Sequence, residues 1–175
     1  MTRPDATSLK PSRTATLRLA TPEATEALAA WLAPRLGPGD VVLLEGGIGA
    51  GKTHFARALI QTRLAAAGRH EDVPSPTFTL VQTYATDGPD IWHADLYRLT
   101  DPAEAWELGL DEAMETAICL VEWPDRLGPL TPPEALRLSL QPSAEGDART
   151  VVLEGADRWA ALLADLARQE TALAS

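Results

Sequence analysis

Residues 46–53 have the spacing with which proteins hold nucleotide phosphates: a glycine, four other residues, and then Gly51-Lys52-Thr53. Glycines let backbone N–H groups turn toward a phosphate, and a helix that begins near Gly51 would point its positive end there. The Lys52 ammonium would then reach the β- and γ-phosphates, and the Thr53 hydroxyl would be a ligand for Mg²⁺. We therefore predict a P-loop whose nucleotide-binding residues are Gly49, Ala50, Gly51, Lys52 and Thr53, with Lys52 also catalytic.

Lysine usage supports this interpretation. Of the 15 Lys and Arg residues, only Lys10 and Lys52 are lysines. A chain that otherwise uses arginine keeps lysine where a compact ammonium is needed. The apolar residues 41–44 before the loop and the helix-favouring residues after Thr53 supply the strand and helix that a P-loop requires.

Two acidic residues follow short apolar stretches that read as strands. Asp95 ends residues 91–95 and Glu122 ends residues 118–122. The carboxyl ends of parallel strands lie at the sheet edge where a P-loop lies, so we expect both carboxylates near the phosphates. Either one could ligate the metal directly or hold a metal-bound water.

Ser75 and Thr77 lie in a proline-rich stretch after the P-loop helix, and proline keeps its predecessor out of helical geometry. Their hydroxyls could contact the γ-phosphate or Mg²⁺, or they could simply cap turns. Guanine-specific P-loop proteins use an Asn-Lys-x-Asp signature, and neither lysine of this chain lies in one. ATP is therefore the expected nucleotide.

The 175 residues, 45% of them hydrophobic, fit one globular domain. We expect residues 1–17 to be a disordered tail and residues 18–175 to form a single P-loop ATPase domain. Strands interleaved with helices predict an α/β fold with a mixed, mainly parallel sheet and helices on both faces. The single cysteine, Cys119, lies in an apolar run and is expected to be a small buried residue.

The net charge of −10 bears on partners. A domain that grips nucleic acid by itself needs a basic face, so we expect no direct nucleic-acid binding, although a basic partner protein could still link the chain to nucleic acid. No apolar stretch approaches the length of a membrane span, and the first residues lack the apolar core of a signal peptide. These features predict a cytoplasmic protein without membrane contact.

Four linked motifs resemble those of one family, TsaE (YjeE), over roughly residues 18–155. They are, in chain order, residues 49–53, 75–81, 93–99 with Asp101, Pro102 and Glu104, and 120–124. The resemblance implies a Mg²⁺-dependent ATPase required for threonylcarbamoylation of adenosine 37 in tRNA. It also implies two partners, the threonylcarbamoyl-transferase subunit and its inactive paralogue.

The resemblance assigns roles to single residues. It makes Thr53 and Glu122 the Mg²⁺ ligands, and Asp95 the switch acid near the γ-phosphate that would position water. Residues 75–77 are the other switch. Thr21 falls where the family's amino-terminal segment approaches the base, and Arg149 would approach the nucleotide from the carboxyl-terminal strands.

The chain departs from the family pattern at two positions. Gly47 stands where the family usually has an acid, and His54 stands where it usually has a hydroxyl residue. We still place His54 among the nucleotide-binding residues, because a ring nitrogen can donate to a phosphate oxygen.

Two other functions fit a P-loop of this size. A small-molecule kinase would need an arginine-bearing lid and a pocket for its acceptor, and the short proline-rich connections leave little room for a lid. A nucleotide-gated adaptor would bind ATP with negligible hydrolysis. Steady ADP formation without an acceptor would count against the kinase, and tight ATP binding with no phosphate release, even with partners added, would favour the adaptor.

Overall fold

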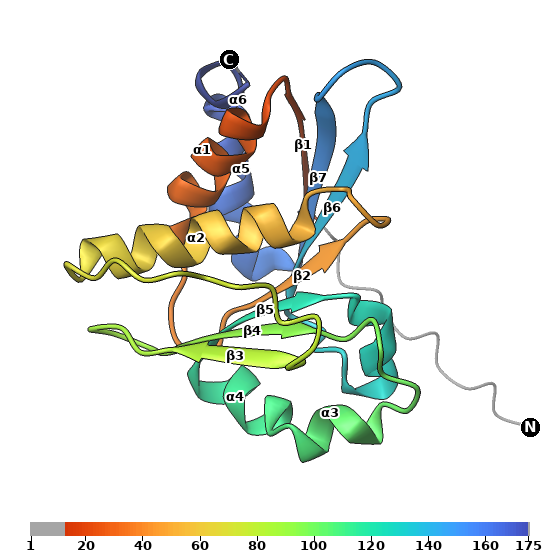
Figure 1. The fold of residues 1–175 in the computed structure, drawn as a ribbon. Coiled ribbons are helices and arrows are strands. Elements are labelled where there is room, and N and C mark those ends of the chain that lie inside the picture. The colour runs from red at the N-terminus through yellow and green to blue at the C-terminus, as the bar shows by residue number, and fades with distance from the viewer. Residues whose placement is uncertain (1–12, 175) are drawn as a thin grey trace, which may run out of the picture.

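The computed structural model describes residues 13–174 of the chain, and a seven-stranded sheet organises them (Figure 1). The strand order is β1-β7-β6-β2-β5-β4-β3. The strands are β1 Arg13–Leu19, β2 Val41–Glu45, β3 Val81–Tyr84, β4 Ile91–Asp95, β5 Ile118–Glu122, β6 Leu136–Pro142 and β7 Arg149–Gly155. Only β3 and β7 run against the other five strands, so the sheet is mixed and mainly parallel, as predicted.

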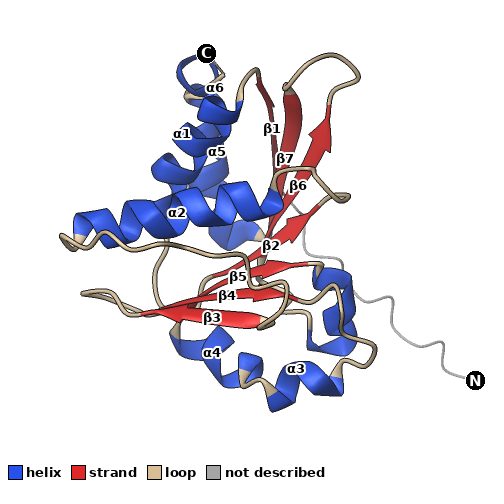
Figure 2. Ribbon diagram, viewed as in Figure 1, coloured by secondary structure: helices blue, strands red, loops and turns tan. Residues whose placement is uncertain are grey.

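Helices cover both faces of the sheet, as predicted (Figure 2). The α-helices are α1 Pro22–Leu32, α2 Lys52–Ala66, α3 Ala103–Glu107, α4 Leu110–Thr116, α5 Ala160–Arg168 and α6 Glu170–Leu173. Short 3₁₀ turns are η1 Ala33–Arg35, η2 Pro124–Leu130 and η3 Asp157–Trp159. α1, α2, α5 and α6 lie on one face and α3 and α4 on the other, which gives a P-loop NTPase-like α/β fold.

Strand alternation divides the buried residues into two cores. In β5, Ile118 and Leu120 face the α1/α2 core, whereas Cys119 and Val121 face the α3/α4 core. Cys119 is buried, as the sequence predicted, and burial raises the pKa of its thiol to about 12. The same alternation places Glu122 on the α2 face of the sheet, where the P-loop helix begins.

The parallel strands β2, β5 and β4 align the residues at their carboxyl ends. Leu44 pairs with Glu122, and Glu122 pairs with Asp95 in the next strand. The two predicted acids are therefore neighbours at the edge where β2 enters the P-loop. In the part of the chain that the structure describes, no helix is both long and apolar enough to cross a membrane.

The prediction of a disordered tail over residues 1–17 is wrong for residues 13–17, which belong to strand β1; residues 1–12 lie outside the described residues. β1 pairs along its whole length with β7 in antiparallel register. Ala15, Leu17 and Leu19 alternate into the core while Thr and Arg side chains face out. The Thr and Arg residues made this alternation hard to recognise in the sequence. The partner strand β7 lies near the other end of the chain, so no local pattern indicated the pairing.

Replacing Leu17 with Ala tests whether β1 is part of the fold. Leu17 is 1% exposed, so its truncation should lower the free energy of unfolding by about 2–4 kcal/mol. Thr16→Ala, on the exposed side of the same strand, is the matched control and should change it by less than about 0.5 kcal/mol. Urea denaturation measures both free energies of unfolding. If Leu17→Ala changed this free energy as little as Thr16→Ala, β1 would not contribute to stability.

Candidate functional site

The loop between β2 and α2 is shaped by glycines in the left-handed half of backbone space. Gly46, Gly49 and Gly51 have φ of 146°, 77° and 106°. A Cβ on Gly46 would lie 2.7 Å from the carbonyl oxygen of Leu140, so no larger residue fits there without a shift. The loop then enters α2 directly at Lys52, whose helix start offers free N–H groups to an anion.

The Lys52 ammonium lies inside the loop that precedes it. Its Nζ donates to the carbonyl oxygens of Gly46 at 2.7 Å and Gly47 at 2.8 Å, and it sits 4.2 Å from the centre of the Trp123 ring. Burial lowers the pKa of Lys52, while the negative charges of Glu122 and Asp95 act to raise it. The cation is therefore held at the P-loop, close to both predicted acids.

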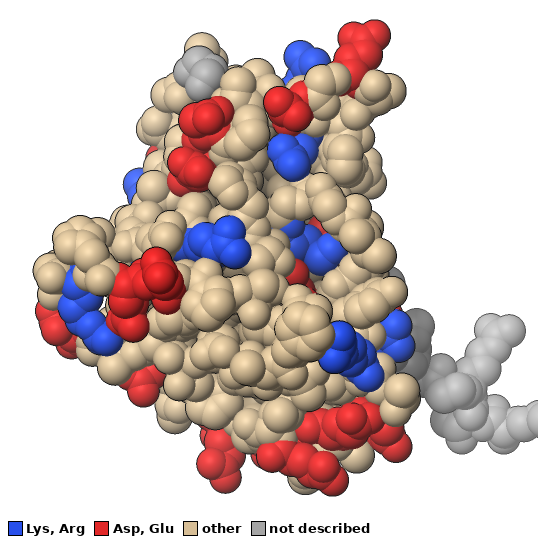
Figure 3. Space-filling model, viewed as in Figure 1, with Lys and Arg blue, Asp and Glu red and all other residues tan. Residues whose placement is uncertain are grey.

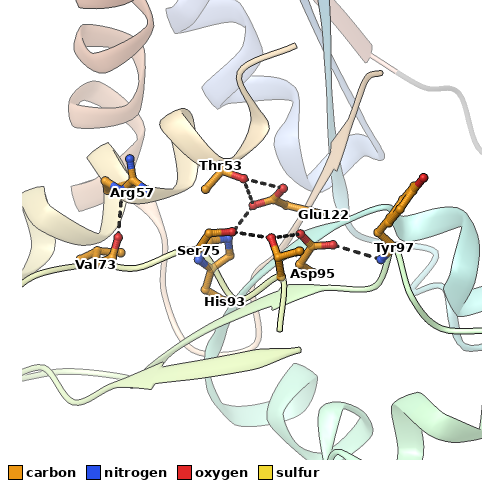
Figure 4. A network of polar contacts seen from close by, with 9 residues as sticks. Thr53, Arg57, Val73, Ser75, His93, Asp95, Tyr97 and Glu122 are labelled. Atoms are coloured by element: carbon orange, nitrogen blue, oxygen red, sulfur yellow. Dashed lines mark hydrogen bonds and ion pairs between the residues drawn. The ribbon is translucent and has the colours of Figure 1, made fainter. Parts of the chain in front are cut away.

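Thr53 and Glu122 face each other across the site (Figure 4). The Thr53 hydroxyl lies 2.9 Å from each oxygen of the Glu122 carboxylate. On the other side of Glu122, His93 Nε2 lies 2.8 Å from Oε1. His93 is completely buried and Glu122 is 2% exposed, so this pair is fixed beneath the P-loop helix.

The Thr53 hydroxyl and the Glu122 carboxylate fit Mg²⁺ better than they fit a metal that protein side chains bind alone. Among the described residues, no group of three or more His, Cys, Asp or Glu side chains could enclose a metal. One carboxylate and one hydroxyl, both hard oxygen donors at the start of a phosphate-binding helix, match the way Mg²⁺ is shared between protein, phosphates and water. Thr53 and Glu122 are the residues that would hold it.

Asp95 is held by the second predicted switch (Figure 4). Its Oδ2 accepts from the Thr77 hydroxyl at 3.3 Å, and Thr77 lies 2.7 Å from the Ser75 hydroxyl. Its Oδ1 accepts from the backbone N–H of Tyr97 at 3.0 Å. The structure thus links residues 75–77 to the end of β4, so a movement of that loop would change the hydrogen bonding of Asp95.

The loop itself is fastened at both ends. At its start, Arg57 Nε donates to the carbonyl oxygen of Val73 at 2.8 Å (Figure 4). At its end, Leu80 adopts a φ of 68° and its carbonyl accepts from the N–H of Asp95 at 2.9 Å. Arg57 lies one turn beyond Thr53 on α2, so the same helix positions the Thr53 hydroxyl and the loop.

A pocket of about 390 Å³ opens over the P-loop. It is lined by Pro22, Gly49, Ala50, Gly51, Lys52, Thr53, His54, Glu122 and Arg149. Arg149 Nε donates to the Ala50 carbonyl oxygen at 2.7 Å, which holds its side chain against the loop. His54 Nε2 lies 3.3 Å from the Pro22 carbonyl oxygen and 3.4 Å from the Glu26 carboxylate.

The remaining predicted residues lie outside this lining. Thr21 is the N-cap of α1, where its hydroxyl accepts from the N–H of Ala24 at 3.1 Å, and its neighbour Pro22 lines the pocket instead. Ser75, Thr77 and Asp95 form a separate cluster beside the pocket. Nucleotide contact by these four residues stays a prediction.

Trp123 is a residue of the site to which the sequence assigned no role of its own. It has a φ of 57°, which is rare for a residue with a Cβ, and its ring packs against Lys52 and against Tyr97 at 4.9 Å. Backbone conformation of this kind has no local sequence signal. The only indication in the sequence was the position of Trp123 directly after Glu122.

The sequence of this chain is similar to those of known proteins. The family model described as "Threonylcarbamoyl adenosine biosynthesis protein TsaE" matches residues 19–151. The chain is 43% identical to a tRNA threonylcarbamoyladenosine biosynthesis protein TsaE from Rickettsia felis over 119 residues, which are 68% of each protein. It is 33% identical to the protein of that name from Bacillus subtilis over 154 residues, 87% of this chain and 94% of that protein.

A solved structure has the same fold. The crystal structure of YdiB from Bacillus subtilis superposes with a TM-score of 0.72 and 29% sequence identity. The match covers 91% of this chain and 97% of that chain.

Two P-loop glycines provide a test of this loop geometry. In Gly51→Ala the new Cβ would lie 2.9 Å from Arg149 Nε at a φ of 106°, whereas at Gly47 no atom lies within 4 Å and φ is not positive. We expect Gly51→Ala to lower the free energy of unfolding by about 1–3 kcal/mol. Gly47→Ala should change it by less than about 0.5 kcal/mol. Urea denaturation of both variants would contradict the loop geometry if the two effects were equal.

Proposed function

The chain belongs to the TsaE family, and on that premise we propose that it is a Mg²⁺-dependent ATPase required for threonylcarbamoylation of adenosine 37 in tRNA. The observation that carries the proposal is the convergence of Lys52, Thr53 and Glu122 on one pocket over the P-loop. The relatives' names, which describe threonylcarbamoyladenosine biosynthesis in tRNA, support the biological role.

In this proposal the P-loop holds the phosphates of ATP. Backbone N–H groups at the start of α2 and the Lys52 ammonium supply the positive charge. Lys52 exchanges its bonds with the loop carbonyls of Gly46 and Gly47 for phosphate oxygens. His54 and Arg149, on the pocket wall, contact the nucleotide beyond the terminal phosphates.

Thr53 and Glu122 would hold Mg²⁺, which when bound neutralises charge on the transferring phosphoryl group. Asp95 orients the attacking water, because its carboxylate can accept a hydrogen bond from that water. The Tyr97 N–H and the Thr77 hydroxyl hold the carboxylate in place. Thr77 and Ser75 form the switch, since a change at the γ-phosphate would move the loop that carries them.

The partners in this proposal are the threonylcarbamoyl-transferase subunit and its inactive paralogue, with tRNA reached only through them. Acidic side chains gather at the end of the molecule that carries α3 and α4 (Figure 3). Asp111 and Glu112 in the first turn of α4 and Glu104 in α3 contribute to this charge. Such a face repels the phosphates of RNA and suits protein partners.

Phosphate release from Mg·ATP tests the proposal, measured with the protein alone and with the two partner proteins and tRNA. We expect slow release that rises when the partners are added. ADP formation in the absence of any acceptor also argues against a small-molecule kinase. Turnover that ignores the partners would contradict the role in tRNA modification, and tight binding without release would favour an adaptor.

Two variants divide binding from turnover in the same assay. Lys52→Ala should abolish measurable nucleotide binding, whereas Asp95→Ala should bind ATP normally and lose about 100-fold or more of turnover. Gln61→Ala, on the exposed side of α2, is the matched control and should behave like the native protein. Normal turnover by Asp95→Ala in the full complex would remove Asp95 from the mechanism.

A further inference from the structure

His93 makes a contact that the proposed mechanism leaves without a role. Its Nε2 lies 2.8 Å from Oε1 of Glu122, and both side chains are almost wholly removed from solvent. The carboxylate can only accept, so Nε2 must carry the hydrogen of this bond. His93 lies on β4 two residues before Asp95 and faces α2 with Glu122 from the next strand (Figure 4).

The other ring nitrogen shows that His93 is not there only to fill space. Nδ1 is buried and has no hydrogen-bond partner among the described residues. A buried polar atom without a partner costs stability, and an aliphatic side chain at this position would avoid that cost. Among the described residues, the only polar contact of the ring is the hydrogen bond to Glu122. That hydrogen bond offsets the cost of leaving Nδ1 without a partner.

That contact distinguishes the two oxygens of Glu122. Both oxygens lie 2.9 Å from the Thr53 hydroxyl and share its single hydrogen, whereas among the described residues only Oε1 also accepts from His93. Each carboxylate oxygen offers about two lone pairs, so Oε2 keeps the larger free capacity for a metal. The bond from His93 also prevents the carboxylate from turning about its last torsion.

We propose that His93 is a positioning residue that fixes the Glu122 carboxylate for Mg²⁺. This inference rests on the proposed function, because it assumes that Glu122 is a metal ligand. His93 acts through Glu122 and touches neither the nucleotide nor the reacting atoms. It supplies the outer hydrogen bond that orients a ligating carboxylate, an arrangement whose loss weakens metal binding in other proteins.

The test measures Mg²⁺ binding directly, with ADP as the nucleotide. The dissociation constant for ADP is measured in EDTA, and Mg²⁺ is then titrated at fixed ADP to find its midpoint. His93→Leu keeps the volume and removes the donor, so its Mg²⁺ midpoint should rise about ten- to hundred-fold. Its ADP affinity in EDTA should stay within about twofold of the native protein, because the P-loop is untouched.

Three further variants give the test its controls. His93→Gln places an amide N–H close to the position of Nε2 and should keep the midpoint within about threefold of native. His93→Asn is too short to reach Oε1 and should behave like His93→Leu, and it serves in its place if the leucine variant does not fold. Ile91→Val, which is buried on the same face of β4, repacks the core without touching Glu122 and should leave the midpoint unchanged.

Three results would overturn the inference. A native midpoint in His93→Leu or His93→Asn would show that Glu122 needs no support from His93. An equal loss of ADP affinity in EDTA and in Mg²⁺ would show a general structural role instead. If the native protein itself bound ADP equally with and without Mg²⁺, the metal part of the proposed function would fail, and the inference would fail with it.

Discussion

The contact between the Thr53 hydroxyl and the Glu122 carboxylate is the interaction on which the rest of the site depends. It joins residues 69 positions apart in the chain. It forms because β2 and β5 are adjacent parallel strands whose carboxyl ends align, and because β2 feeds directly into α2 through the P-loop. The pairing of β5 with β4 then brings His93 and Asp95 to the same edge. One stretch of parallel sheet therefore brings together Thr53, Glu122 and Asp95.

The same arrangement explains how the protein keeps buried charges. Lys52, Asp95 and Glu122 are each at most 5% exposed, and isolated buried charges are costly. Each of them has specific partners: loop carbonyls and an aromatic face for Lys52, a hydroxyl and an imidazole for Glu122, a hydroxyl and a backbone N–H for Asp95. The partners of Lys52 are the ones most easily exchanged for phosphate oxygens, because two of them are neutral carbonyls. Lys52 is therefore a partnered buried cation whose partners phosphate oxygens could replace.

Much of this fold could be predicted from the sequence because its signals are local. The P-loop glycines and the short apolar strands ending in Asp95 and Glu122 all lie where the residues indicated. Strand β1 could not be recognised, since its partner β7 lies near the other end of the chain and Thr and Arg residues masked its alternation. The left-handed conformation of Trp123 and the rotamer of Lys52 depend on tertiary packing, which no local pattern encodes. Nucleotide contact by Thr21 stays a prediction; in the structure its hydroxyl caps α1.

The most direct measurement of the central claim is a crystal structure of the protein with Mg²⁺ and a slowly hydrolysed ATP analogue. We expect the phosphates to occupy the P-loop pocket and Lys52 Nζ to leave the carbonyl oxygens of Gly46 and Gly47 to contact them. We also expect density for the metal between Thr53, Glu122 and the phosphates. A nucleotide bound elsewhere, with Lys52 still bonded to both carbonyl oxygens, would contradict the central claim.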